Sequence, residues 1–104
     1  MKRIPSKIRI GGEDIEVRFV ERCEDNSIGT AQNATGIIEI ADKFNKDSIQ
    51  SESSKAGTFY HEVTHIILNI MRHKSMNDEA FVCTFAAFLN EAMADAVFIE
   101  KEEL

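Results

Sequence analysis

The sequence contains little of what marks fibrous, low-complexity or disulfide-rich proteins. One proline and five glycines occur among 104 residues, too few for a collagen-like or linker-like chain. The two cysteines, Cys23 and Cys83, lie sixty residues apart and form no C-x-x-C pair. We therefore expect two buried or partly buried free thiols rather than a disulfide.

The sequence also lacks a long apolar run and an excess of basic residues. No stretch approaches the length of a membrane span, and residues 1–12 are charged but lack the apolar segment of an export signal. Acidic residues outnumber basic ones by 18 to 12, which gives a net charge of −6. Because an acidic surface repels phosphate groups, binding to nucleic acid or to an anionic membrane is disfavoured. We expect a cytoplasmic protein.

What is present is the composition of an ordinary globular domain, with 43% hydrophobic and 29% charged residues. The length predicts a single domain covering residues 1–104. A chain of this size can bury a core without disulfides. No internal repeat or linker-like segment interrupts it.

The first half of the chain has the pattern of strands. Residues 7–10 and 15–20 alternate between polar and apolar, and a Gly-Gly pair separates them, which predicts a β-hairpin. Residues 28–33 can form a short strand, and residues 37–41 form one because they are rich in isoleucine. We expect a small antiparallel sheet of three or four strands.

The second half has the pattern of helices. Apolar residues recur at helical spacing from residue 53 to 71, and a second helix is expected from 77 or 78 to 100, capped by Ser75 or Asn77. Four serines could cap the first helix: Ser48, Ser51, Ser53 and Ser54. The second helix has a stripe expected to be buried: Val82, Phe85, Ala86, Leu89, Ala92, Met93 and Ala96. Strands followed by helices predict an α+β fold, with the sheet packed on two C-terminal helices.

The stretch FYHEVTHIIL contains the pattern H-E-x-x-H at residues 61–65. Residues four apart on a helix differ by about 40° in direction and lie one turn apart, so His61 and His65 can bind one ion. Neutral imidazole is a good zinc ligand. Glu62 points about 60° away from His65, which places it beside the ion, where it can act as a general base. The alternative is a helix that carries two histidines by chance.

A third ligand must come from elsewhere in the chain. The metzincin pattern requires glycine and histidine at later positions of the same motif, where this chain has Leu68 and Met71. His73 lies about 80° around the helix from His65 and is better explained as an exposed loop histidine.

Three acidic residues of the second helix compete for this role. Glu79 lies about 80° from the centre of the apolar stripe and Glu91 about 160°, so Glu79 is the better placed to reach a neighbouring helix. Asp78 points closer to the stripe but occupies the first turn, where acidic residues commonly stabilise the helix N-terminus. Residues 90–95, NEAMAD, look like the stretch that carries the third ligand in thermolysin-like gluzincins, which keeps Glu91 as an alternative.

These segments together carry a family resemblance. The order of a β-hairpin, IGTAQNATGIIEIA, YHEVTHIIL and NDEAFVCTFAAFL resembles the short zinc-peptidase-like proteins of bacteriophage and prophage genomes. Those are minimal H-E-x-x-H zincins of the gluzincin kind, distantly related to ImmA/IrrE-type metallopeptidases. The resemblance covers most of residues 6–93.

The resemblance implies a zinc-dependent metallopeptidase acting on a protein or peptide. By this likeness His61, His65 and Glu79 bind zinc and Glu62 is the general base. An edge strand, expected at residues 37–41, would align an extended substrate by strand addition. Tyr60 and His73 are the residues near the motif able to stabilise an oxyanion, and neither is assigned.

Two other functions are compatible with the same residues. The zinc could stabilise a protein-binding module that has no catalytic turnover. Alternatively, the chain could be an interaction protein without a metal. The sequence alone does not identify the substrate, the oligomeric state or the host.

Overall fold

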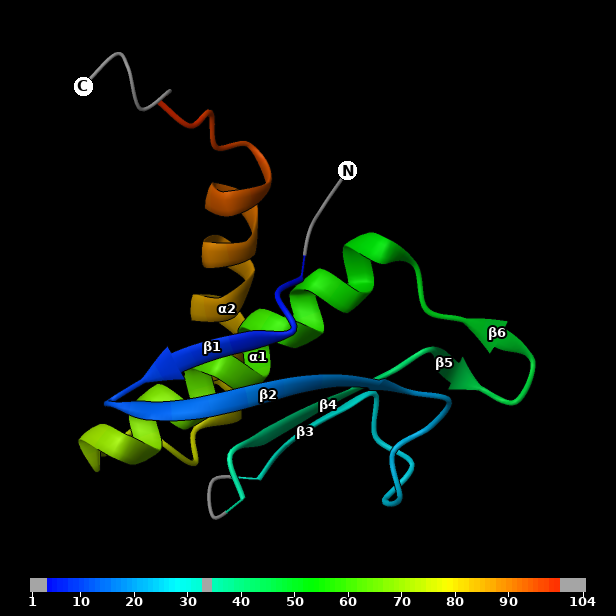
Figure 1. The fold of residues 1–104 in the computed structure, drawn as a ribbon, viewed down its shortest axis with the longest axis horizontal. Helices are drawn as coiled ribbons and strands as arrows, with labels where there is room; N and C mark the ends of the chain where they lie inside the picture. The colour runs from blue at the N-terminus through cyan, green and yellow to red at the C-terminus, as the bar shows by residue number, and fades with distance from the viewer. Residues whose placement is uncertain (1–3, 33–34, 100–104) are drawn as a thin grey trace.

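The computed structural model describes residues 4–32 and 35–99, and within them it confirms an α+β fold (Figure 1). Strands β1 (Lys7–Ile10), β2 (Glu13–Val20), β3 (Gly29–Gln32) and β4 (Ile37–Ala41) form a sheet in the order β1-β2-β4-β3. The short strands β5 (Lys43–Asn45) and β6 (Ser48–Ile49) form a separate pair. Two helices follow, α1 (Glu52–Met71) and α2 (Glu79–Ala94).

The predicted hairpin is confirmed by β1 and β2. The two strands are antiparallel, and Ile10 pairs with Glu13 next to the turn. Gly11 and Gly12 have φ angles of 59° and 81°. This left-handed region is open to glycine at little cost, which explains the Gly-Gly pair in the sequence.

The sheet is mixed, so the prediction of an antiparallel sheet is wrong for one pair of strands. β2 and β4 are parallel, and Val17 pairs with Ile38. After β2 the chain passes to the outer edge as β3, then turns back as β4 between β2 and β3. The isoleucine-rich β4 thus takes the interior position, while β3, with the sequence GTAQ, takes the edge. Alternation in the sequence shows which residues point inward but not which strands become neighbours.

The hydrophobic core lies between the sheet and α1. Its buried members come from β2, β4 and α1: Ile15, Val17, Ile38, Ile40, Phe59 and Ile66. The two residues from each strand are two positions apart, as one face of a strand requires. The two from α1 are seven apart, or about two helical turns. One face of α1 is therefore committed to the sheet.

Helix α1 begins at one of the four predicted serines. Ser51 is the N-cap, and its side chain accepts a hydrogen bond from the Ser54 backbone N–H at 3.1 Å. Its C-cap is Arg72, with a left-handed φ of 52°. The backbone N–H of Arg72 donates a hydrogen bond to carbonyl groups in the last turn of the helix, as is usual for left-handed C-caps.

Helix α2 differs from its prediction in cap, length and burial. Asp78 is the N-cap rather than Ser75 or Asn77, and the helix ends at Ala94 instead of near residue 100. Of its predicted stripe, Val82 and Ala86 alone are buried. The reason is that α2 packs against α1 and extends away from the sheet (Figure 1). The contact with α1 covers only a small part of the apolar face of α2, which explains why phenylalanines of α2 remain exposed.

Neither helix within residues 4–32 and 35–99 combines the length and apolar character that crossing a membrane requires.

The core makes a direct prediction about stability. Ile38 is 0% exposed, whereas Ile49 of β6 is 75% exposed. Ile38→Ala should lower the free energy of unfolding by about 2–5 kcal/mol, because it removes buried methylene groups and leaves a cavity. Ile49→Ala, the matched control, should change it by less than about 0.5 kcal/mol. Urea unfolding measures both, and equal losses would contradict the position of the core.

Candidate metal centre

The motif residues of α1 lie on the sides of the helix that the core leaves free. Phe59 and Ile66 are buried in the core, which fixes how α1 is rotated. The imidazole rings of His61 and His65 lie next to each other, with 4.9 Å between their centres. Both side chains are partly buried. The structure thus brings together the two histidines that the sequence pairs.

Glu79, the first residue of α2, reaches both histidines. Its Oε2 is 3.3 Å from His61 Nε2 and its Oε1 is 2.8 Å from His65 Nε2. The Glu79 side chain is 65% exposed, and ion pairs so open to solvent contribute little to stability. The contact therefore contributes little to the stability of the fold. Its interest is that it brings together three side chains that could bind one metal ion.

The other two acidic candidates are placed differently. Asp78 accepts a hydrogen bond from the Phe81 backbone N–H at 3.1 Å. It therefore caps the N-terminus of α2, which was the predicted alternative to a role as metal ligand. Glu91 is exposed toward the far end of α2. Of the acidic side chains described for α2 and its cap, Glu79 is the one whose carboxylate is paired with His61 and His65.

The spacing of these donor atoms can be compared with that of a tetrahedral zinc site. Bonds of about 2.0–2.1 Å to nitrogen and oxygen place neighbouring ligand atoms roughly 3.4 Å apart. Each of the two distances from Glu79, 3.3 and 2.8 Å, is close to that value, but they involve different carboxylate oxygens. The side chains of His61, His65 and Glu79 would therefore have to move before one ion could have all three as ligands.

Cys83 creates a second, overlapping donor set. One ligand atom each from His61, Glu79 and Cys83 lie within 4.8 Å of one another. Cys83 Sγ is 3.8 Å from His61 Nδ1, whereas His61 Nε2 faces Glu79. The two nitrogens of one imidazole point in different directions, so a single ion uses one of them. We favour the Nε2 side, because a second imidazole and a carboxylate converge there.

Glu62 is buried beside the histidines. It is 8% exposed, and burial raises its pKa from 4.5 to about 7, although the neighbouring His65 opposes this rise. A carboxyl group with a pKa near neutrality can both accept and return a proton. This is the property that general acid–base catalysis needs.

The pKa of His61 is shifted in the opposite direction. Burial lowers it below its ordinary value of 6.5, and the nearby His65 lowers it further, while Glu79 raises it. The neutral form of His61 is therefore favoured near neutral pH. Metal binding requires a neutral imidazole, so burial favours the form of His61 that could bind a metal ion.

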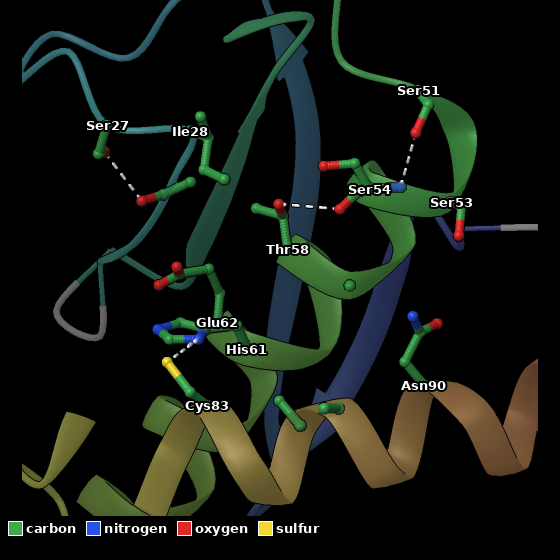
Figure 2. Close-up of a pocket in the computed structure, with 14 residues that line it drawn as sticks. Ser27, Ile28, Ser51, Ser53, Ser54, Thr58, His61, Glu62, Cys83 and Asn90 are labelled. Carbon is green, nitrogen blue, oxygen red and sulfur yellow. Dashed lines mark hydrogen bonds between the residues drawn. The ribbon is translucent and has the colours of Figure 1, made fainter. Parts of the chain in front are cut away.

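Glu62 faces two cavities, one on each side of it. The larger, of about 710 Å³, lies between the chain around Ser27 and Ile28, α1 and α2 (Figure 2). The smaller, of about 250 Å³, also includes His65. Small residues, among them Gly57 and Ala86, line the larger one and leave it open where the two helices meet.

The strand beside these cavities is β3, which corrects the predicted edge strand. β4 (Ile37–Ala41) is interior, because it pairs with both β2 and β3. β3 is at the edge of the sheet, with Gly29 lining the larger cavity and Ala31 the smaller. The family resemblance led to the prediction of an edge strand at residues 37–41, but this isoleucine-rich segment is paired on both sides.

Gly29 lets β3 approach α1 closely. A Cβ atom built at Gly29 would lie 2.3 Å from Thr58 Cγ2 and 3.2 Å from Glu62 Oε2, and the first distance is a severe clash. A larger residue would therefore push β3 away from α1, and the absence of a side chain at Gly29 contributes to the burial of Glu62.

The two residues considered for oxyanion stabilisation are engaged elsewhere. Tyr60 packs against the hydrophobic core and makes an edge-on contact with Phe59. The ring of His73 accepts a hydrogen bond at Nδ1 from the Ser75 backbone N–H, at 3.0 Å, and stacks on Phe81. His73 thus belongs to the turn between the helices, as predicted, but it is partly buried rather than exposed.

Cys83 is the site residue that sequence reasoning missed. Both cysteines are free thiols, as predicted, but Cys23 is buried and Cys83 is exposed, so the prediction of burial is wrong for Cys83. Cys83 follows Glu79 by four positions, the same spacing that pairs His61 with His65. That spacing was the available signal, because a residue one turn from a ligand shares its helix face.

Comparisons of the chain with protein-family models, with curated proteins and with solved structures found no match. The functional argument therefore depends on the motif and on the geometry of these side chains.

The raised pKa of Glu62 predicts a pH-dependent stability in the metal-free chain. Because the folded-state pKa of about 7 lies above the ordinary value of 4.5, ionising Glu62 costs more in the folded state than in the unfolded state. The protonated Glu62 side chain therefore contributes to the free energy of unfolding. This contribution is fully present below pH 4.5 and is lost as the pH rises through 7. Its size is on the order of 3 kcal/mol, because each unit of pKa difference corresponds to about 1.4 kcal/mol.

The measurement is urea unfolding with a chelator, between pH 4.5 and 8. Glu62→Gln mimics the protonated carboxyl group, so the variant should gain stability relative to the native chain as the pH rises. A difference between the two proteins that does not change with pH would show that Glu62 titrates normally.

Proposed function

We propose that the chain is a zinc-dependent metallopeptidase, with His61, His65 and Glu79 as ligands and Glu62 as general base. The observation that carries this proposal is the convergence of both Nε2 atoms on one carboxylate, with Glu62 buried next to them. Two imidazoles and one carboxylate form a donor set of catalytic zinc sites that leave a position open.

Zinc bound there supplies a Lewis acid that makes a water molecule more acidic and polarises the peptide carbonyl. The residues of the chain do the rest. Glu62 accepts the proton of the attacking water at a carboxylate oxygen. It then returns that proton to the leaving amine. Burial of Glu62 keeps bulk water from competing for this proton.

The two cavities and β3 support a peptide or protein as substrate. β3 pairs with β4 on one side and is the edge of the sheet on the other. An extended peptide can form backbone hydrogen bonds with such an edge. Gly29 and Ala31 of β3 line the cavities on either side of Glu62, so a peptide along β3 would pass the base.

A zinc-stabilised protein-binding module is the second candidate, and one observation favours it. Cys83 is close enough to His61 and Glu79 for the three to share an ion. A cysteine as the fourth protein ligand would close the site, and closed sites are typical of structural zinc. The coordination of the ion separates the two candidates.

The peptidase proposal predicts that Glu62→Gln separates metal binding from catalysis. The variant should keep one zinc per chain, because Glu62 is not a ligand, and lose about 10²- to 10⁴-fold in cleavage rate, because the proton transfer is lost. The assay is mass spectrometry of a mixed peptide digest incubated with the zinc-loaded chain. Glu91→Gln, an exposed change on α2, is the matched control.

Equal cleavage by the native chain and Glu62→Gln would refute Glu62 as the base. A zinc-loaded native chain that cleaves no peptide in the mixture would favour the binding module.

The identity of the third ligand is tested by zinc affinity. Glu79→Gln should weaken zinc binding by roughly 100-fold or more, since changes next to ligands already cost about 10- to 100-fold. Glu91→Gln should leave it unchanged. Competition with a chromophoric chelator at fixed pH gives both affinities, and a larger loss for Glu91→Gln would assign the ligand to the other end of α2.

A further inference from the structure

Helix α2 reaches both nitrogens of the His61 ring. Glu79 Oε2 is 3.3 Å from Nε2, and Cys83 Sγ is 3.8 Å from Nδ1, within hydrogen-bonding range for sulfur. Figure 2 shows the sulfur of Cys83 directed at the ring. Because Glu79 and Cys83 are four positions apart, they lie on one face of α2.

We propose that Cys83 is a positioning residue that holds the imidazole of His61 with Nε2 available to a metal ion. This inference rests on the proposed function, because it assigns His61 Nε2 as the ligand atom. A ligating histidine normally has its other ring nitrogen engaged in a hydrogen bond, which fixes the tautomer and the ring orientation. Among the described residues, Cys83 is the hydrogen-bond partner of His61 Nδ1.

A thiol suits this place because it can both donate and accept. In the metal-free chain, His61 can donate Nε2–H to Glu79 and accept the S–H of Cys83 at Nδ1. When an ion takes the lone pair of Nε2, the proton belongs on Nδ1, which then donates to the sulfur. Serine has the same two capacities, whereas alanine has neither.

The alternative role for Cys83 is direct ligation, in which its sulfur joins His61 and Glu79 around one ion. The sulfur, however, lies beside Nδ1 of the ring, whereas Glu79 lies beside Nε2. The positioning role keeps His61, His65 and Glu79 together and leaves the sulfur outside the ligand set.

The test compares Cys83→Ala with Cys83→Ser. Cys83 is exposed, so neither change disturbs the core, and circular dichroism verifies the fold. We expect the alanine variant to bind zinc about 10- to 100-fold more weakly, as is typical when a ligand loses its hydrogen-bonding partner. We expect the serine variant to recover most of that loss. Thr84→Ala, an exposed neighbour on α2, is the matched control.

Two spectroscopic readouts separate positioning from other roles. With zinc bound to each form, imidazole ¹⁵N chemical shifts should place the His61 proton on Nδ1 in the native and serine forms, and show a mixture of Nε2 and Nδ1 ligation in the alanine form. Cobalt-substituted protein should lack an intense sulfur-to-cobalt charge-transfer band.

Each possible outcome has a distinct meaning. A charge-transfer band that disappears in Cys83→Ala would make Cys83 a ligand and overturn the inference. Equal zinc affinity of the native chain and Cys83→Ala would also overturn it, while leaving the proposed peptidase intact. A native chain that binds no zinc would overturn the proposed function and this inference with it.

Discussion

The packing of one face of α1 on the sheet is the constraint on which the candidate site depends. Phe59 and Ile66 are anchored against β2 and β4, and an anchored helix cannot rotate without exposing those side chains. The same rotation therefore directs His61 and His65 toward α2 and turns Glu62 toward β3. Apolar burial thus sets the geometry of polar groups that contribute little to stability themselves.

The second constraint is the closeness of β3 to α1 at Gly29. Replacing its hydrogen with a methyl group would create a clash with Thr58, so this approach depends on glycine. The consequence is electrostatic, because a strand held against α1 removes water from Glu62 and raises the pKa of that carboxyl group. A packing detail of the sheet edge thereby tunes the group proposed as the base.

The sequence predicted local features well and spatial neighbours poorly. The hairpin, the strand at 37–41 and α1 follow from alternation, turn residues and helical spacing, and the structure has them. The pairing of β2 with β4 and the small contact of α2 depend on how distant segments meet, which no local pattern specifies. At the site, helical periodicity sufficed to bring Glu79 to the histidines. The same periodicity places Cys83 on the helix face of Glu79, whereas the distance between the two cysteines in the sequence carries no information about this neighbour.

The charges of the site follow from the same burial. Burial lowers the pKa of His61 and raises that of Glu62, so both groups favour their neutral forms in the metal-free chain. For His61 this is the form that binds a metal, whereas a base must be ionised. A divalent cation near Glu62 favours its carboxylate, because opposite charge nearby lowers the pKa of an acid. In the proposed enzyme, Glu62 therefore becomes an effective base chiefly when the ligands beside it are loaded, which couples proton transfer to metal binding.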